Sequence, residues 1–475
     1  MIKVKFSHNK YFELNQFLID GSNLERICYI FGYHYQDLNK NIVIIPDTII
    51  APNNDDNYAS STYVRLDDNI AEYIYREFAK SDHTVIINCH SHPFDSSDAV
   101  RFSSIDDRSD NAEYDYLFNK LAKYKNQDFI HLAYLRGNNA TAMRLIKGNG
   151  VFDYNISIRV IGQQYSYINN SNYIQQQNHR MDEQFLRHAH LFGGQIAQNK
   201  LSDIQVAVVG CGGTGSIVAE NLVRLGVKHI TLIDDDLVEE TNLNRLQGAR
   251  VSDINRYKVD VIAENIRQYA RDVFVNKIKT NAFSKSSYNH LKSSDIIFSC
   301  VDNAVARFFI NQISASFFIP VFNVGVRIFE SENHEINNVW RVDIFVPSTT
   351  SCMDCAYYAV YDRSNASVKF FDKNTYQNMV RAGYINDDTE IKDPSVYSLN
   401  QQAVSQLMNE FHNYFVGFKK FIPHIRGYLS PTQTKSEHSE TRLFKVNGTG
   451  SCGTCIDYLG KCGKYHDSIK LRLDG

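Results

Sequence analysis

The residues best suited to chemistry fall in two clusters, one near the start of the chain and one in its middle. In the first cluster, His90 and His92 alternate along an apolar run, and Asp106 follows shortly after it. Residues i and i+2 of a strand point to the same face, so both imidazoles can reach one ion. Two neutral imidazoles and one carboxylate leave a fourth tetrahedral position open, as in a catalytic zinc site.

Each half of this pattern also has a simpler interpretation. Ser103-x-x-Asp106 at the start of a helical pattern is typical of a capping box, and pairs of surface histidines are common. A third element favours the metal hypothesis, because Glu25 precedes an apolar run that ends in Gly32. That distance lets one strand lie beside the strand that carries both histidines.

Taken in order, these three elements resemble the JAMM (JAB1/MPN) metalloprotease family over about the first 150 residues. The resemblance implies a catalytic zinc ion held by His90, His92 and Asp106. It also implies that Glu25 is the general base and that Ser103 donates a hydrogen bond to the oxyanion. The reaction would cleave an isopeptide or peptide bond after a ubiquitin-like C-terminus. The interval between His92 and Ser103 is about three residues longer than in the family.

The second cluster is a glycine-rich turn between a strand pattern, IQVAVV, and a helix pattern, SIVAENLVRLG. Its glycines are Gly210, Gly212, Gly213 and Gly215. Such a turn lets backbone N–H groups approach a phosphate at a helix N-terminus. Asp234 ends the next strand, where a carboxylate can bind ribose hydroxyls. This pattern alone suits a dinucleotide dehydrogenase equally well.

The side chains that follow favour a triphosphate. Arg245 and Lys258 supply two cations, and Asp302 follows a further buried strand. A pair of cations with an aspartate suits a triphosphate and its Mg²⁺ better than a nicotinamide ring.

With Asp234-x-Asp236 and Asn242-x-x-Arg245, these residues resemble the ThiF/MoeB/HesA family over about residues 180–345. The resemblance implies adenylation of a protein's C-terminal carboxylate by ATP and Mg²⁺. Phosphate would then be bound by Arg245 and Lys258 and positioned by Asn242, with Mg²⁺ on Asp302 and ribose on Asp234.

Cysteines form two pairs, Cys352-x-x-Cys355 and Cys452-x-x-Cys455. Four thiolates close a tetrahedral structural zinc site, although Cys-x-x-Cys can also be a redox motif. Residues 303–351 and 356–451 contain no cysteine that could form a thioester, which leaves Cys462 as the weak candidate. We therefore expect the adenylate to pass directly to an acceptor or to a partner's cysteine. Relatives carry an arginine that reaches a partner subunit's ATP, and Arg180 or Arg187 could serve here.

The chain as a whole has 475 residues, a net charge of −3 and 43% hydrophobic residues. We expect an α/β protein with an N-terminal JAMM/MPN-like α+β domain (1–160) and a linker (161–185). A Rossmann-like ThiF-type domain (186–475), with a mostly parallel sheet and a structural zinc, would follow. Residues 356–450 are polar and irregular and indicate little. The charge does not favour nucleic acid, and the sequence shows neither a signal peptide nor a membrane span, so we expect a cytoplasmic protein.

The two halves fit one substrate if the first exposes or releases the C-terminus that the second activates. The sequence therefore predicts a bacterial ubiquitin-like conjugation enzyme, expected as a homodimer. Its partners would be a β-grasp ubiquitin-like protein and a conjugating enzyme. The alternatives are adenylation of a peptide or small carboxylate, and a first domain that is only a binding scaffold.

Overall fold

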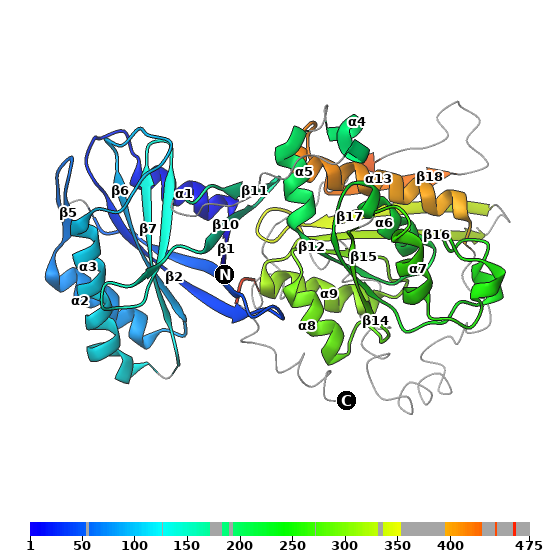
Figure 1. Ribbon diagram of the computed structural model, residues 1–475, viewed down its shortest axis with the longest axis horizontal. Helices are drawn as coiled ribbons and strands as arrows, with labels where there is room; N and C mark the ends of the chain where they lie inside the picture. The colour runs from blue at the N-terminus through cyan, green and yellow to red at the C-terminus, as the bar shows by residue number, and fades with distance from the viewer. Residues whose placement is uncertain are drawn as a thin grey trace. The chain divides into compact units, whose positions relative to one another are not determined.

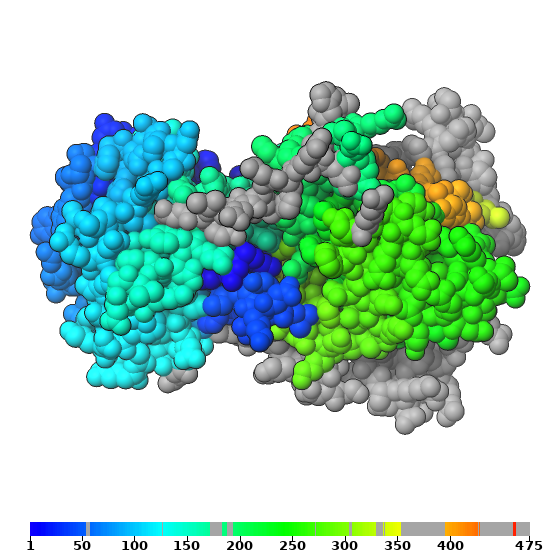
Figure 2. Space-filling view, in the orientation of Figure 1, coloured from blue at the N-terminus to red at the C-terminus, as the bar shows by residue number. Residues whose placement is uncertain are grey.

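The computed structural model divides into two compact units, one reaching from Met1 to Gln177 and the other starting at Asn178. It describes residues 1–53, 57–125, 127–171, 183–189, 193–270, 272–330, 336–352, 395–429, 442–443 and 459–461. Figure 1 labels the elements of both units, and Figure 2 shows one face of each unit as a space-filling surface. In the described part of the chain, no helix is long and apolar enough to span a bilayer.

The first unit is built on a nine-stranded sheet in the order β11-β10-β1-β3-β2-β6-β7-β8-β9. Its strands are β1 (Ile2–Ser7), β2 (Ile27–Gln36), β3 (Ile42–Ile50), β6 (Val85–His92), β7 (Ile130–Gly137), β8 (Thr141–Ile146), β9 (Phe152–Asp153), β10 (Ile156–Ile161) and β11 (Tyr165–Ile168). A separate hairpin pairs β4 (Asn57–Ala59) with β5 (Val64–Leu66). Strand β11 pairs with β10, so the sheet extends into the segment 161–185 that was expected to be a linker.

The helices of this unit cover both faces of the sheet. They are α1 (His8–Leu18), α2 (Asp68–Lys80) and α3 (Ser104–Asp115), which a π-helical turn continues. Alternation along β6 divides its side chains between two cores: Ile87 and Cys89 pack in the core that includes α1, and Ile86 in the core that includes α2. The even-numbered residues that follow Ile86, which include His90 and His92, therefore face the side that α2 and α3 cover.

The second unit is built on an eight-stranded mixed sheet in the order β14-β13-β12-β15-β16-β17-β18-β19. Its strands are β12 (Gln205–Val209), β13 (His229–Ile233), β14 (Phe274–Ile278), β15 (Ile296–Ser299), β16 (Val321–Glu330), β17 (Ile336–Phe345), β18 (His424–Leu429) and β19 (Arg442–Leu443). The strands from β14 to β16 run parallel, and β17 to β19 extend the sheet antiparallel. This Rossmann-like sheet confirms the predicted α/β class.

Helices lie on both faces of this sheet (Figure 1). They are α4 (Leu186–Ala189), α5 (Gly194–Asp203), α6 (Gly213–Arg224), α7 (Lys258–Ile266), α8 (Lys285–Ser293), α9 (Ala304–Phe317) and α13 (Tyr397–Val416). α6 packs between α7 and α13, whereas α8 and α9 pack together against β12, β15 and β16. The strand order reverses between β12 and β15. In open α/β sheets, ligands generally bind outside the carboxyl ends of the strands at such a reversal.

Candidate metal centre and nucleotide-binding site

The two histidines of β6 and a carboxylate of α3 converge in the first unit. Asp106 Oδ1 lies 3.2 Å from His90 Nε2, and Asp106 Oδ2 lies 3.7 Å from His92 Nε2. The ligand atoms of all three residues lie within 4.8 Å of one another. β6 supplies the two imidazoles by its alternation, and α3 supplies the carboxylate from its first turn.

Glu25 completes this cluster from the residues just before β2. Its side chain is 6% exposed, and its Oε1 lies 3.9 Å from His92 Nε2. The Glu25 N–H donates to the carbonyl oxygen of Ser60, in the turn of the β4–β5 hairpin, at 2.8 Å. The hairpin thus fixes the backbone that carries this carboxylate.

Ser103 is the N-cap of α3 and forms a capping box with Asp106. The Asp106 N–H donates to Ser103 Oγ at 3.2 Å, and the Ser103 N–H donates to Asp106 Oδ2 at 2.6 Å. The capping interpretation of this pair is therefore confirmed. The carboxylate that caps the helix also faces the histidines, as the metal hypothesis requires.

Burial and charge shift the pKa values of all four groups. Burial raises the pKa of Glu25 to about 7, with His90 working against it. Burial alone would also raise the pKa of Asp106, but His90 and the bonds with Ser103 hold it well below its usual range. Burial lowers the pKa of His92, and the pKa of His90 is raised because Asp106 outweighs the effect of burial. The cluster thus combines the ionised carboxylate of Asp106 with the carboxylate of Glu25, which can take up a proton near neutral pH.

The donor set of this cluster suits a zinc ion. Tetrahedral ligands at about 2.1 Å from zinc lie about 3.4 Å from one another, and one ligand atom from each of His90, His92 and Asp106 lies within 4.8 Å of the other two. Among the described residues, the buried His90 Nε2 makes no well-aligned hydrogen bond, although Asp106 Oδ1 lies 3.2 Å away. A buried imidazole nitrogen that is poorly hydrogen-bonded is costly, and a metal ion would satisfy it.

In the second unit, the glycine-rich turn joins β12 to α6 where the strand order reverses. Gly210 has a φ of +84°, which favours glycine. A Cβ at Gly215 would overlap the carbonyl oxygen of Gly210 and lie 2.9 Å from its carbonyl carbon. Gly212 is the N-cap of α6, and a glycine has no side chain to occupy the free N–H groups there. The turn is therefore tight, and its N–H groups can serve an anion.

Asp234 and Asp236 follow β13 and lie beside this turn. Asp234 Oδ2 accepts from the Cys211 N–H at 2.6 Å, and its Oδ1 accepts from the Asp236 N–H at 2.8 Å. Lys258, the first residue of α7, pairs with Asp236 at 2.6 Å. Burial raises the pKa of Asp234, although Lys258 and the two backbone donors act against that shift. The structure thus brings the predicted ribose carboxylate and the predicted phosphate lysine to one place.

The surroundings of the other three predicted nucleotide-binding residues, Arg245, Asn242 and Asp302, differ from one another. The Cγ and Cδ atoms of Arg245 would lie 3.4 Å from a Cβ at Gly213, so this side chain reaches the glycine turn. Asn242 is buried and its Oδ1 accepts from the Glu239 N–H at 3.2 Å, so its amide also stabilises a helical turn. Asp302 is exposed between β15 and α9.

Five other predicted residues lie outside the described ranges. These are Arg180, Cys355, Cys452, Cys455 and Cys462. Cys352 is described and buried, and Arg187 is exposed in α4. Cys211 is buried, and burial raises the pKa of Cys300 to about 12. Both thiols therefore behave as packed side chains next to the turn.

Sequence reasoning missed the polar residues that surround the cluster of His90, His92 and Asp106. Asn88 Nδ2 donates to Asp110 Oδ1 at 2.8 Å and to Glu113 Oε2 at 2.7 Å, and all three residues are buried. The available signal was the acidic spacing i, i+4, i+7 of Asp106, Asp110 and Glu113, which puts three carboxylates on one helix face.

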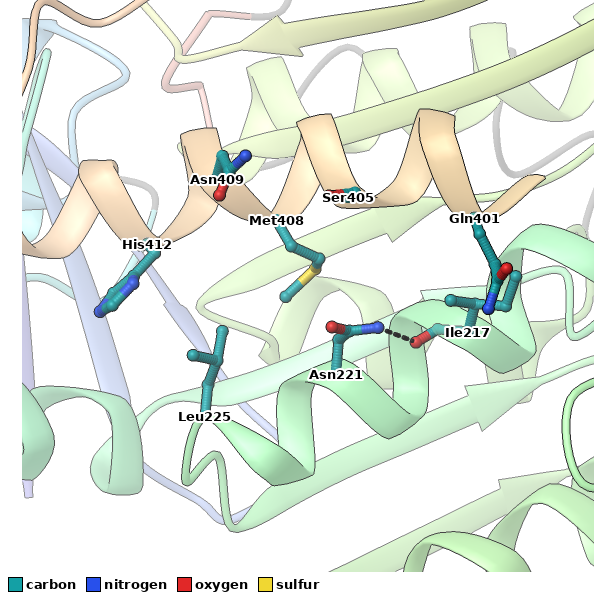
Figure 3. Close-up of a pocket in the computed structure, with 8 residues that line it drawn as sticks. All are labelled: Ile217, Asn221, Leu225, Gln401, Ser405, Met408, Asn409 and His412. Carbon is teal, nitrogen blue, oxygen red and sulfur yellow. Dashed lines mark hydrogen bonds between the residues drawn. The ribbon is translucent and has the colours of Figure 1, made fainter. Parts of the chain in front are cut away.

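A groove of about 330 Å³ lies between α6 and α13. Figure 3 shows Ile217 and Asn221 of α6, with Leu225 at its C-cap, facing Met408 and His412 of α13 across it. Among the described residues that line it, the predicted site residues do not occur. The groove is therefore separate from the glycine turn.

The chain belongs to the ThiF family, whose model matches residues 185–442. It is 31% identical over 172 residues to the adenylyltransferase and sulfurtransferase UBA4 of Meyerozyma guilliermondii, a match covering 35% of this chain and 40% of that protein. It is 28% identical over 173 residues to the ubiquitin-like modifier-activating enzyme 5 of Arabidopsis thaliana, covering 33% and 38%. This chain thus spans about two fifths of either relative. The crystal structure of E. coli MccB with MccA-N7isoASN is 20% identical, with a TM-score of 0.45, and covers 58% of this chain and 75% of that one.

Proposed function

We propose that this chain uses ATP to adenylate the C-terminal carboxylate of a ubiquitin-like protein. The observation that carries the proposal is the gathering of the glycine turn, Asp234, Arg245 and Lys258 at the carboxyl ends of β12 and β13. Membership of the ThiF family and similarity to an enzyme named for activating ubiquitin-like modifiers support it. A homodimer remains part of the proposal.

The proposed reaction needs positioning and charge neutralisation more than acid–base catalysis. The carboxylate oxygen attacks the α-phosphorus of ATP, and pyrophosphate leaves. Backbone N–H groups at the start of α6 bind the phosphates, and Lys258 and Arg245 offset their charge. Asp234 accepts from the ribose hydroxyls, and Asp302 would hold Mg²⁺, which supplies further charge neutralisation.

The first unit is proposed to be a zinc peptidase that processes the same ubiquitin-like protein. His90, His92 and Asp106 would hold the ion, which supplies Lewis-acid polarisation of a carbonyl when bound. Glu25, with a pKa of about 7, can accept a proton from water and deliver it to the leaving amine. Ser103 would donate a hydrogen bond to the oxyanion.

ATP–pyrophosphate exchange tests the adenylation step. We expect exchange when the chain is given a β-grasp protein ending in glycine, and none with K258M. Exchange with a short peptide but not with the β-grasp protein would instead support the peptide-modifying alternative. Failure with both would refute adenylation of a polypeptide carboxylate.

Cleavage of a β-grasp protein extended beyond its terminal glycine tests the peptidase. We expect the wild type to release the extension, and E25Q to retain zinc but lose cleavage. Equal cleavage by the wild type and H90A/H92A would refute the metal-dependent reaction. Zinc retention without cleavage by any variant would leave the first unit as a binding scaffold.

A further inference from the structure

Arg144 lies on β8 and is fully buried in the first unit. Its guanidinium lies between the rings of Phe102 and Phe152, 3.9 Å from each centroid. A buried charge is costly unless it is paired and hydrogen-bonded. The partners of this guanidinium therefore identify what the residue does in the fold.

Those partners are two carboxylates of α3. Arg144 Nε and Nη2 donate to Asp110 Oδ2 at 2.9 and 2.6 Å, and Nη1 donates to Asp107. These carboxylates belong to the first two turns of α3, directly after Asp106. One side chain from the sheet thus binds the part of the helix that presents the proposed metal ligand.

β6 binds the same helix face through Asn88, which is two residues before His90. Its amide donates to Asp110 at 2.8 Å, so one carboxylate is fixed by both β6 and β8. Hydrogen bonds of this kind are directional and set the rotation of a helix, whereas apolar contacts permit sliding. Rotation of α3 determines how far Asp106 lies from the imidazoles.

A second set of contacts links Arg144 to His90 through the ring of Phe102. The ring of Phe102 packs against the guanidinium on one side, and it packs edge-on to His90, with 6.0 Å between centroids. Arg144 therefore supports the helix that carries Asp106 and also the ring that contacts one imidazole.

We propose that Arg144 is a positioning residue of the metal centre, which fixes α3 and Phe102 so that Asp106 and His90 meet at the distance one ion requires. The inference rests on the proposed zinc site. Loss of such outer partners typically weakens metal affinity about 10- to 100-fold, and we expect a loss in this range for R144M. R144K keeps the charge but not the fork of donors, so we expect a smaller loss.

The experiment measures the zinc dissociation constant of the full chain by competition with a chromophoric chelator. Zinc is assigned to the metal centre when the wild type binds it and the H90A/H92A variant does not. Arg159 offers a matched control, because it is 4% exposed in the same sheet but donates to Tyr165 of β11 at 3.0 Å. We expect R159M to lower the free energy of unfolding without changing the zinc affinity.

R144M leaves Asp110 buried without its cation, so a second variant, R144M/D110N, removes both charges and preserves folding. We expect it also to bind zinc at least tenfold more weakly, as loss of an outer partner implies. Wild-type affinity in folded R144M/D110N, or an equal loss in R159M, would overturn the positioning role. If the wild type itself holds no zinc that depends on His90 and His92, the metal centre fails, and the inference fails with it.

Discussion

Two alanine substitutions in the glycine turn separate what the fold needs from what the nucleotide needs. At Gly215, a Cβ would lie 2.9 Å from the carbonyl carbon of Gly210 and 3.3 Å from Cys300 Cβ. The backbone of the turn would have to move, and overpacking of this kind costs about 1–3 kcal/mol. We expect G215A to lower the free energy of unfolding by about that amount.

Gly212 is the matched position, because a Cβ there meets no atom of the described residues within 4 Å. Its φ of −83° suits any residue, and alanine loses less chain entropy on folding, so stability should change by less than about 1 kcal/mol. The added methyl group would stand at the N-cap of α6, where the phosphates are proposed to bind. We therefore expect G212A to weaken MgATP binding at least tenfold, a loss of about 1.4 kcal/mol.

The assays are urea unfolding for stability and calorimetric titration with MgATP for affinity. G215A should lose both stability and affinity, whereas G212A should lose affinity alone. Wild-type MgATP affinity in G212A would refute the assignment, because a phosphate cradled by this turn cannot tolerate a methyl group at its centre.

Three further predictions concern the two histidines, Lys258 and Glu25. Zinc analysis should give about two ions per chain for four-ligand sites of this kind, and one fewer for the H90A/H92A double variant; an unchanged content would exclude the histidine site. K258M should weaken MgATP binding about 10- to 100-fold, as loss of a charge-assisted bond implies, and K228M, which alters an exposed ion pair with Asp272, should not. Burial raises the pKa of Glu25 from 4.5 to about 7 in the metal-free chain, so the folded state holds a proton that the unfolded state releases. The resulting stability is present below about pH 4.5 and is lost as the pH rises through about 7. In EDTA, E25Q should flatten the pH dependence of urea unfolding in this range, and an unaltered slope would contradict it.

The sequence predicted the local elements of the second unit well because their signals are short-range. The run IQVAVV, the glycines and the helix pattern that follow it are contiguous, and they form β12 and α6. Asp234 could be added because it directly follows the next parallel strand, whereas Lys258 was assigned from the ThiF/MoeB/HesA resemblance and lies at the start of α7. The ThiF assignment is confirmed by the match of residues 185–442.

Elements that depend on distant partners were not predicted. Residues 356–450 were expected to be irregular, yet α13 spans twenty of them, Tyr397–Val416. Its buried residues Leu399, Ala403, Leu407 and Phe411 recur every fourth position, a helical period that the polar residues between them obscure. The antiparallel strands β17 and β18 also escaped prediction, because their pairing joins residues far apart in the chain.

The cluster of His90, His92 and Asp106 shows why two interpretations of one motif need not compete. Asp106 Oδ2 accepts from the Ser103 N–H at 2.6 Å and so begins a helix, while its Oδ1 lies 3.2 Å from His90 Nε2. A carboxylate has two oxygens, and each interpretation needs mainly one of them. The capping bond also fixes the side-chain rotamer, because Oδ2 cannot leave Ser103 without losing the cap. The capping role of Asp106 therefore holds its carboxylate where the proposed metal ligand must lie, and a sequence signal for a helix start here does not count against the metal hypothesis.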